Sequence, residues 1–349
     1  MGVQQVFYSV TQAARVGWYL GQYLVAGRLS GPEPLPLPAG SAPPPDRGAI
    51  LADLRTLLRR DWSNIAAGLY RLPPDLVRDP RRLLHDAARF FRDVPAVARR
   101  RRQGGGQEMS GDPGSRALPR YYRQNFHYQT GGYLSAESAR LYDHQVEVLF
   151  AGGADAMRRQ ALVPIARHLA GRSGQGLRLL DVGSGTGRFL TFVLDNWPRM
   201  HCTALDLSIP YLARARAALA PWSRAAAVLA PAERLPFADA SQDIVTSVFL
   251  FHELPAAVRA RAAAEMARVL KPGGLLVLLD SLQLGDRPDF DPLLHLFPVA
   301  FHEPYYADYV QADIAALFSG HGLRPQAPER AFLAKVMAFD RPAVGTDGA

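Results

Sequence analysis

The fold of this chain is decided by the stretch from Leu177 to Phe189, which reads Leu-Arg-Leu-Leu-Asp-Val-Gly-Ser-Gly-Thr-Gly-Arg-Phe. Apolar residues typical of a buried strand end at three glycines, Gly183, Gly185 and Gly187, and a helical pattern follows from Phe189. Because glycine tolerates positive φ and carries no Cβ, such a turn lets the backbone come close to a nucleotide-like ligand. The stretch therefore predicts a strand, a glycine-rich turn and the start of a helix.

Two carboxylates indicate which ligand this turn receives. In pyrophosphate sites the third glycine follows one residue later than here, and Asp181, inside the strand, would repel a pyrophosphate. The same carboxylate suits a cationic amino group. Asp206 ends the next expected strand about twenty residues further on, the spacing at which a carboxylate meets a ribose diol. A cationic amino acid group and a ribose together describe S-adenosylmethionine.

Further motifs follow in order along the chain. The set is Asp181-Val-Gly-Ser-Gly-Thr-Gly187, the acid Asp206, Ala232-Glu-Arg-Leu-Pro-Phe237, Gln242-Asp-Ile-Val245 and Arg268-Val-Leu-Lys-Pro-Gly-Gly274. With this set the chain, over roughly residues 161–282, resembles the class I S-adenosylmethionine-dependent methyltransferases, in motif style the ubiquinone/menaquinone C-methyltransferase-like group. The resemblance implies an enzyme with S-adenosylmethionine as cofactor, bound by Asp181, Gly183, Ser184, Gly185, Gly187, Asp206, Leu207, Ala232, Glu233 and Phe249.

Strand and helix patterns alternate through the second half of the chain. Strands are expected at 177–182, 202–206, 226–229, 244–249 and 275–280, and helices at 189–196, 210–219 and 256–269. The alternation predicts a parallel sheet with helices on both faces and the ligand at the carboxyl ends of the strands. A helix near 309–318 and a strand near 332–339 complete the seven-stranded, mostly parallel Rossmann-like α/β sheet that the resemblance implies. The methyltransferase domain is expected over 161–342, with a substrate insertion at 284–306.

The chain departs from the family pattern in two places. Pro231 stands where family members usually carry an acid that binds the adenine amino group, so adenine recognition would rest on backbone groups near Ala232 and on Glu233. After the fourth strand there is no N/D-P-P-Y/F motif, which disfavours methylation of amino groups on nucleic-acid bases or on protein glutamine.

Methyl transfer is an in-line displacement at an already activated carbon, so the enzyme's task is mainly positioning. The sequence accordingly contains neither a metal-binding motif nor a nucleophile elbow. Removal of a proton from the acceptor would need a base, and His252 or Glu253, just after the fourth strand, is expected to act as the base or to orient the acceptor. The alternative is that His252 only shapes the pocket. His127 and His302 are rival bases.

Residues 1–102 are expected to form a helical module with a proline-rich spacer at 31–46. Its first helix, near 3–29, is amphipathic, and two interpretations stay open: it packs on its own domain or on a homodimer partner, or it contacts a bilayer interface. The helix that starts near Pro80 is expected to be interrupted at Pro95 and is rich in arginine. Up to Ala117 there are 17 arginines against 10 acids, so most of the net charge of +8 lies in this third of the chain. A solvated helix end explains such a cluster more simply than a nucleic-acid patch.

A flexible linker is expected at 103–118 and an aromatic lid at 119–160, where a helix capped by Ser135 begins. The resemblance suggests that this lid and the insertion contribute to the substrate pocket. The alternative is an aromatic cluster that only seals a helix to the domain. The candidate substrate residues are Tyr121, His127, Tyr128, Tyr133, Phe297, His302 and Tyr305.

The favoured function is transfer of a methyl group to carbon or oxygen of a small, aromatic or lipophilic acceptor. Two alternatives remain: an RNA methyltransferase that uses the basic module, which the missing nucleic-acid motifs disfavour, and a non-catalytic cofactor-binding scaffold. No DNA partner and no metal are expected. The single cysteine, Cys202, and the absence of a basic leader or a long apolar run predict a cytoplasmic protein, peripheral to the inner face of a membrane if the helices bind there.

Overall fold

The computed structural model describes residues 2–31, 42–77, 79–111 and 115–343. They form two compact units. The helical unit comprises Met1–Gly68, Leu72–Met157 and Leu284–Ala307, and the sheet unit comprises Leu69–Arg71, Arg158–Gln283 and Asp308–Ala349. Most of the predicted spacer at 31–46, and three residues of the linker predicted at 103–118, lie outside the described residues.

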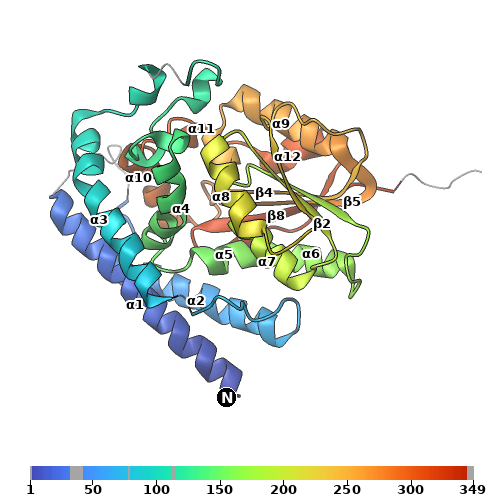
Figure 1. Cartoon of the computed structure of the whole chain (residues 1–349), viewed down its shortest axis with the longest axis horizontal. Helices are drawn as coiled ribbons and strands as arrows, with labels where there is room; N and C mark the ends of the chain where they lie inside the picture. The colour runs from blue at the N-terminus through green and yellow to red at the C-terminus, as the bar shows by residue number, and fades with distance from the viewer. Residues whose placement is uncertain (1, 32–41, 78, 112–114, 344–349) are drawn as a thin grey trace, which may run out of the picture. The chain divides into compact units, whose positions relative to one another are not determined.

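The sheet unit is built on a mixed sheet of eight strands (Figure 1). The strands are β1 (Arg178–Val182), β2 (His201–Asp206), β3 (Ala225–Leu229), β4 (Gln242–Val248), β5 (Leu270–Ser281), β6 (Arg324–Pro325), β7 (Glu329–Ala331) and β8 (Ala334–Asp340). Their order is β3-β2-β1-β4-β5-β8-β6, with β7 also paired to β8. The neighbours from β3 to β5 are parallel, and all three pairings of β8 are antiparallel.

The first helix of this unit precedes the strands, and the others connect them. They are α6 (Leu162–Leu169), α7 (Arg188–Asn196), α8 (Ile209–Leu219), α9 (Ala256–Val269) and α12 (Ile314–Ser319), while α5 (Ala154–Gln160) and α11 (Tyr306–Tyr309) cross the boundary between the units. From β1 the chain winds outward through β2 to β3, and from β4 it winds the other way to β5. Since crossovers are right-handed, the two directions place α7 and α8 on one face and α9 on the other. The sheet therefore changes winding direction between β1 and β4, where ligands bind in open α/β sheets.

The predicted Rossmann-like fold is confirmed, and each of the five parallel strands lies where the sequence placed it. The central strands are covered on both faces, which explains their nearly continuous apolar runs: Leu179, Leu180, Val245 and Leu276 are fully buried. The sheet has eight strands rather than seven, because the C-terminal segment adds β6 and β7 beside β8. Strands of two and three residues carry too little alternation to be recognised in a sequence.

The helical unit contains α1 (Val3–Ser30), α2 (Arg47–Ala66), α3 (Pro80–Gln103), α4 (Ala136–Leu149) and α10 (Asp291–Phe301), with short 3-10 turns η1 (Glu108–Gly111), η3 (Arg120–Tyr122), η4 (Phe126–Tyr128), η5 (Gly132–Leu134) and η7 (Pro288–Phe290). The predicted cap of α4 is confirmed, since Ser135 Oγ accepts a hydrogen bond from the N–H of Ser138 at 3.0 Å. None of the described helices is long and apolar enough to cross a membrane.

The predicted interruption at Pro95 is wrong, because α3 continues through this residue to Gln103. A proline inside a helix removes one backbone hydrogen bond. Val94 and Ala98, on either side of it, are buried in the unit, so tertiary packing offsets the lost bond.

Candidate active site

The glycine-rich turn after β1 has the backbone conformation that its sequence requires. Gly183, Gly185 and Gly187 have φ values of 73°, 53° and 76°, in the left-handed region that favours glycine. A Cβ on Gly183 would lie 2.8 Å from a methyl group of Leu250, which belongs to the loop after β4. At Gly185 the nearest atom to such a Cβ would be 3.9 Å away, so the backbone there borders open space. The turn is thus tightly packed at Gly183 and accessible at Gly185.

Asp181, near the end of β1, is a buried carboxylate of which only one oxygen is engaged. Its side chain is 1% exposed, Oδ1 accepts a hydrogen bond of 2.7 Å from Thr246 Oγ1, and Oδ2 has no hydrogen-bond partner among the described residues. Burial raises the pKa of Asp181 to about 7, although the Thr246 hydrogen bond opposes the rise. A buried acceptor without a donor fits the cationic amino group expected from the sequence.

Asp206, at the end of β2, joins the two loops on either side of it. Its Oδ2 accepts from the N–H of Gly185 and its Oδ1 from the N–H of Ser208, both at 2.8 Å. Burial of the carboxyl group raises the pKa of Asp206, while backbone N–H groups, including that of Leu207, oppose the rise. Asp206 therefore lies beside the accessible glycine, as a group that binds a ribose diol must. The neighbouring Ser184 is half-buried on the same turn.

The carboxyl end of β4 carries a strained residue. Phe249 has φ of 57°, which is uncommon for a bulky side chain, and its N–H donates to the carbonyl of Leu279 in β5 at 2.8 Å. Such strain persists only where surrounding contacts hold it, and it concentrates at functional sites. Here it turns the chain sharply into the loop 250–254, which packs on Gly183.

His252 is the predicted catalytic residue with the most defined surroundings. It is 6% exposed, and its Nδ1 lies 2.5 Å from Oδ1 of Asp280 at the end of β5. The other oxygen of Asp280 accepts from the N–H of Phe251 at 2.7 Å. Burial lowers the pKa of His252, but the charge and hydrogen bond of Asp280 outweigh burial and raise it overall. Glu253 Oε1 is 3.9 Å from Nε2 of the same ring.

Asp280 is the residue of this site that sequence reasoning missed. The signal was present, because an acid ends an otherwise apolar strand, Leu275-Leu-Val-Leu-Leu-Asp280, at the same edge of the sheet as Asp181. A second support comes from Arg259 of α9, which is buried and donates to the carbonyls of Phe251 and Leu254 at 3.0 and 2.9 Å. The loop that carries His252 is thus held by Asp280 of β5, by the turn after β1 and by Arg259 of α9.

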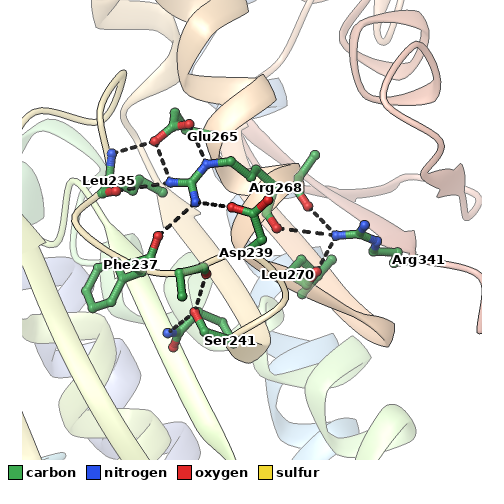
Figure 2. A network of polar contacts seen from close by, with 11 residues as sticks. Leu235, Phe237, Asp239, Ser241, Glu265, Arg268, Leu270 and Arg341 are labelled. Carbon is green, nitrogen blue, oxygen red and sulfur yellow. Dashed lines mark hydrogen bonds and ion pairs between the residues drawn. The ribbon is translucent and has the colours of Figure 1, made fainter.

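One arginine, Arg268, holds the segment that follows Ala232 and Glu233 (Figure 2). Arg268 donates to the carbonyls of Leu235 and Phe237 at 3.1 and 2.8 Å and pairs with Asp239 and Glu265 at 2.7 Å each. The N–H of Leu235 also donates to Glu265, and the Arg268 hydrogen bond lowers the pKa of that carboxyl. The motifs at 232–237 and 268–274, which the sequence showed separately, are therefore in direct contact in the structure. Ala232 is buried and Glu233 is half-buried.

The seven candidate substrate residues all lie in the helical unit, whereas the predicted cofactor residues lie in the sheet unit. Within the helical unit the two aromatic segments meet. Tyr128 donates to the carbonyl of Val299 at 3.0 Å, and its ring is 5.4 Å from that of His302. Further contacts join Tyr305 to the carbonyl of Tyr121, His127 to Glu303 and to Phe301, Tyr133 to Phe126, and Phe297 to Phe301 and Tyr306.

The insertion after β5 belongs to the helical unit and not to the sheet unit. Residues 284–307 pack with the segment 119–134 in the helical unit, although they follow β5 in the chain. His127 and Tyr128 both have positive φ, 57° and 53°, so the segment is held in a strained conformation by these contacts.

The chain is similar to known methyltransferases. Residues 179–274 match a family model described as a methyltransferase domain. The chain is 34% identical over 213 residues to demethylmenaquinone methyltransferase from Deinococcus radiodurans, an alignment that covers 60% of this chain and 78% of the relative. It is 36% identical over 131 residues to malonyl-(acyl-carrier protein) O-methyltransferase from Xylella fastidiosa, covering 34% of this chain and 43% of that protein, and so spans less than half of that relative.

Among solved structures, an S-adenosylmethionine-dependent methyltransferase from Aquifex aeolicus aligns with 60% of this chain and 99% of its own, at 16% identity and a TM-score of 0.43. The extended similarity to the Deinococcus enzyme and the matched domain show the family of this chain. The chain belongs to the class I S-adenosylmethionine-dependent methyltransferases.

Proposed function

We propose that this enzyme transfers the methyl group of S-adenosylmethionine to a carbon or oxygen atom of a small, lipophilic or aromatic acceptor. The observation that carries the proposal is a mostly apolar cavity of about 770 Å³ in the helical unit, which Arg28, Arg47, Asp93 and Arg101 also line. Its volume is in the range of pockets for small molecules.

The cavity lies between α1, α3 and α4. Its walls include Phe90, Val94 and Val97 of α3 and Val146 and Leu149 of α4. His127, one of the candidate substrate residues, also lines the cavity, together with Phe301 of the insertion. Since apolar walls favour an acceptor with an apolar ring or chain, we infer that the cavity receives the lipophilic part of the acceptor.

The sheet unit would hold the cofactor. S-adenosylmethionine supplies a methyl group on a sulfonium, whose leaving group is neutral. We assign its amino group to Oδ2 of Asp181 and its ribose to Asp206, with the backbone of Gly185 beside them. Ala232 and Glu233 would bind the adenine, in a segment held in place by Arg268. The contacts described above support the roles of Asp181 and Asp206, and the family motif supports those of Ala232 and Glu233.

His252 would orient the acceptor instead of removing its proton. The charge and hydrogen bond of Asp280 raise the pKa of His252, so a larger share of the ring is imidazolium at a given pH, and an imidazolium donates hydrogen bonds but cannot accept a proton. Asp280 fixes the ring by binding Nδ1. Of the two predicted candidates, a base role would then remain for Glu253.

The names of the relatives suggest two kinds of acceptor: demethylmenaquinone in demethylmenaquinone methyltransferase, and an oxygen of malonyl-(acyl-carrier protein) in malonyl-(acyl-carrier protein) O-methyltransferase. The size and apolar walls of the cavity favour a ring with an apolar chain. Incubation with methyl-labelled S-adenosylmethionine and a lipid extract or an RNA fraction of the source cells tests this directly. We expect label in the lipid fraction, and label confined to RNA would overturn the proposal.

The cavity offers a sharper test through glycines of α1. Gly27 lines the cavity, and a Cβ there meets no atom within 4 Å, so Gly27→Trp should fill the cavity without disturbing the helix. Gly21 has the same open surroundings in the same helix but does not line the cavity, which makes Gly21→Trp the matched control. We expect Gly27→Trp to raise KM for a lipophilic acceptor at least about tenfold, with unchanged cofactor affinity. Equal kinetics of the two variants would exclude the cavity as the acceptor site.

A further inference from the structure

Helix α1 is inverted relative to an ordinary surface helix. In a surface helix of a globular protein the apolar side faces the core and the polar side faces water. In α1 the buried residues are Tyr8, Gln12, Tyr19 and Gln22, all of which carry polar groups.

The buried side of α1 makes specific polar contacts inside the helical unit. Tyr8 donates to Asp61 at 2.6 Å, Arg15 pairs with Glu147 at 2.8 Å, and the side chain of Gln22 lies 2.8 Å from Nε2 of His144. Because these partners come from α2 and α4, the rotation of α1 about its axis is fixed. The exposed side is therefore a property of the fold and not of a loosely attached helix.

The exposed side of α1 is predominantly apolar, with Gln4 and Ser9 as its exposed polar side chains near the N-terminal end. Val3 is 87% exposed, Val10 63% and Leu29 62%. Val6, Phe7 and Val25 are also exposed, with Ala13, Ala14, Gly17 and Gly21 between them. Arg15 is the only charged residue of α1 before Arg28, and it belongs to the buried side. A predominantly apolar surface of this length marks a site that another apolar phase covers.

The charges around this surface indicate what covers it. Arg102 donates to the carbonyl of Ser30 at 2.9 Å, so it lies at the C-terminal end of α1. Arg28, Arg47 and Arg101 line the cavity that α1 also borders. Arg28, Arg47 and Arg102 are exposed. A cluster of arginines at the end of an apolar helix face complements anionic lipid headgroups, whereas two copies of this unit would bring like charges together.

We propose that the exposed face of α1 lies in the interface of an anionic membrane, with the arginines at its C-terminal end on lipid phosphates. The apolar side chains from Val3 to Leu29 would enter the headgroup region, and the polar contacts of the buried side would keep the helix parallel to the surface. This inference holds whatever the methyl acceptor is. It assigns the helical unit a role in membrane docking that the methyl-transfer chemistry does not require.

The test uses two matched substitutions in the full-length protein. Val10 on the α1 face is 63% exposed, and Val77, in the same unit but outside α1, is 62% exposed. Val10→Asp and Val77→Asp therefore make the same chemical change at equal exposure. Binding is measured by flotation with vesicles of phosphatidylcholine containing about one third phosphatidylglycerol, and with pure phosphatidylcholine vesicles as the uncharged comparison. Circular dichroism and thermal melting establish that both variants fold.

We expect the wild-type protein and Val77→Asp to bind the anionic vesicles equally and to bind them less as salt is raised. Val10→Asp should lower the vesicle partition coefficient at least about tenfold, because it replaces an inserted side chain by a charge. The proposal is overturned if the wild type does not bind anionic vesicles, or if both variants bind alike. It is also overturned if ultracentrifugation finds a dimer that only Val10→Asp dissociates while vesicle binding is unchanged, since a second copy then covers the face.

Discussion

Cofactor binding should depend on pH through the carboxyl group of Asp181. In the ligand-free protein burial raises its pKa to about 7. The proposed partner, the amino group of the cofactor, is attracted only by the ionised carboxylate. Binding below that pKa must therefore release a proton. At pH 6 only about one molecule in eleven has Asp181 ionised, so the apparent Kd should rise about tenfold for each further pH unit of acidification.

At alkaline pH the affinity for the cofactor should fall for a different reason. Once the α-amino group of the ligand loses its proton at alkaline pH, the ion pair with Asp181 is lost from the ligand side. The tightest binding is therefore expected above about pH 7 and below the pKa of the amino group. Asp181→Asn, which keeps the shape but removes the charge, should raise Kd about a hundredfold or more and abolish the acid-side dependence.

Isothermal titration calorimetry with S-adenosylhomocysteine measures these quantities, because this ligand shares the amino and ribose groups of the cofactor. Titrations in buffers of different ionisation enthalpy should show release of nearly one proton per ligand at pH 6 in the wild type and none in Asp181→Asn. Thr246→Val is the graded comparison: it removes the hydrogen bond that holds the pKa of Asp181 down, so the acid limb should move to higher pH. An unchanged acid limb in Asp181→Asn would refute the assignment.

The raised pKa of Asp181 also predicts how the stability of the protein depends on pH. Because the folded-state pKa of Asp181 is raised, its contribution to stability is complete below the unfolded pKa and is lost as pH rises to about 7. The difference corresponds to about 4 kcal/mol. Asp181→Asn should therefore stabilise the ligand-free protein at pH 8 and have little effect at pH 4, as measured by denaturant unfolding at the two pH values.

Gly183→Ala should destabilise the protein by about 1–3 kcal/mol and weaken cofactor binding, because it adds both positive-φ strain and a close contact. Gly176→Ala, with φ of 79° and no atom near the new Cβ, isolates the strain alone, and equal effects of the two on ligand affinity would contradict the packing argument. Arg268→Met should lower unfolding stability by about 1–2 kcal/mol and raise the Kd of the cofactor several-fold, whereas Arg261→Met, on the exposed side of α9, should change neither. His252→Gln should reduce kcat about tenfold to a hundredfold with cofactor affinity intact. It should also remove the loss of activity that the wild type shows as pH rises through the raised pKa of the imidazole, and an unchanged pH profile would exclude His252 from the reaction.

The sequence by itself determined the five parallel strands of the sheet and the cofactor, and it predicted the residues of the cofactor site. Strand and helix periods and the glycine turn are local properties of the chain, so Asp181, the three glycines and Asp206 could be recognised without coordinates. They fall at the carboxyl ends of neighbouring strands because parallel pairing brings every such end to one edge of the sheet.

Only the tertiary structure decided the contacts between segments far apart in the chain. It paired Asp280 with His252, joined the insertion 284–307 to the segment 119–134, and carried α3 through Pro95. It also turned the polar side of α1 inward. An amphipathic pattern states that a helix has two sides, but which side is buried depends on the partners that other helices supply, here Asp61, Glu147 and His144.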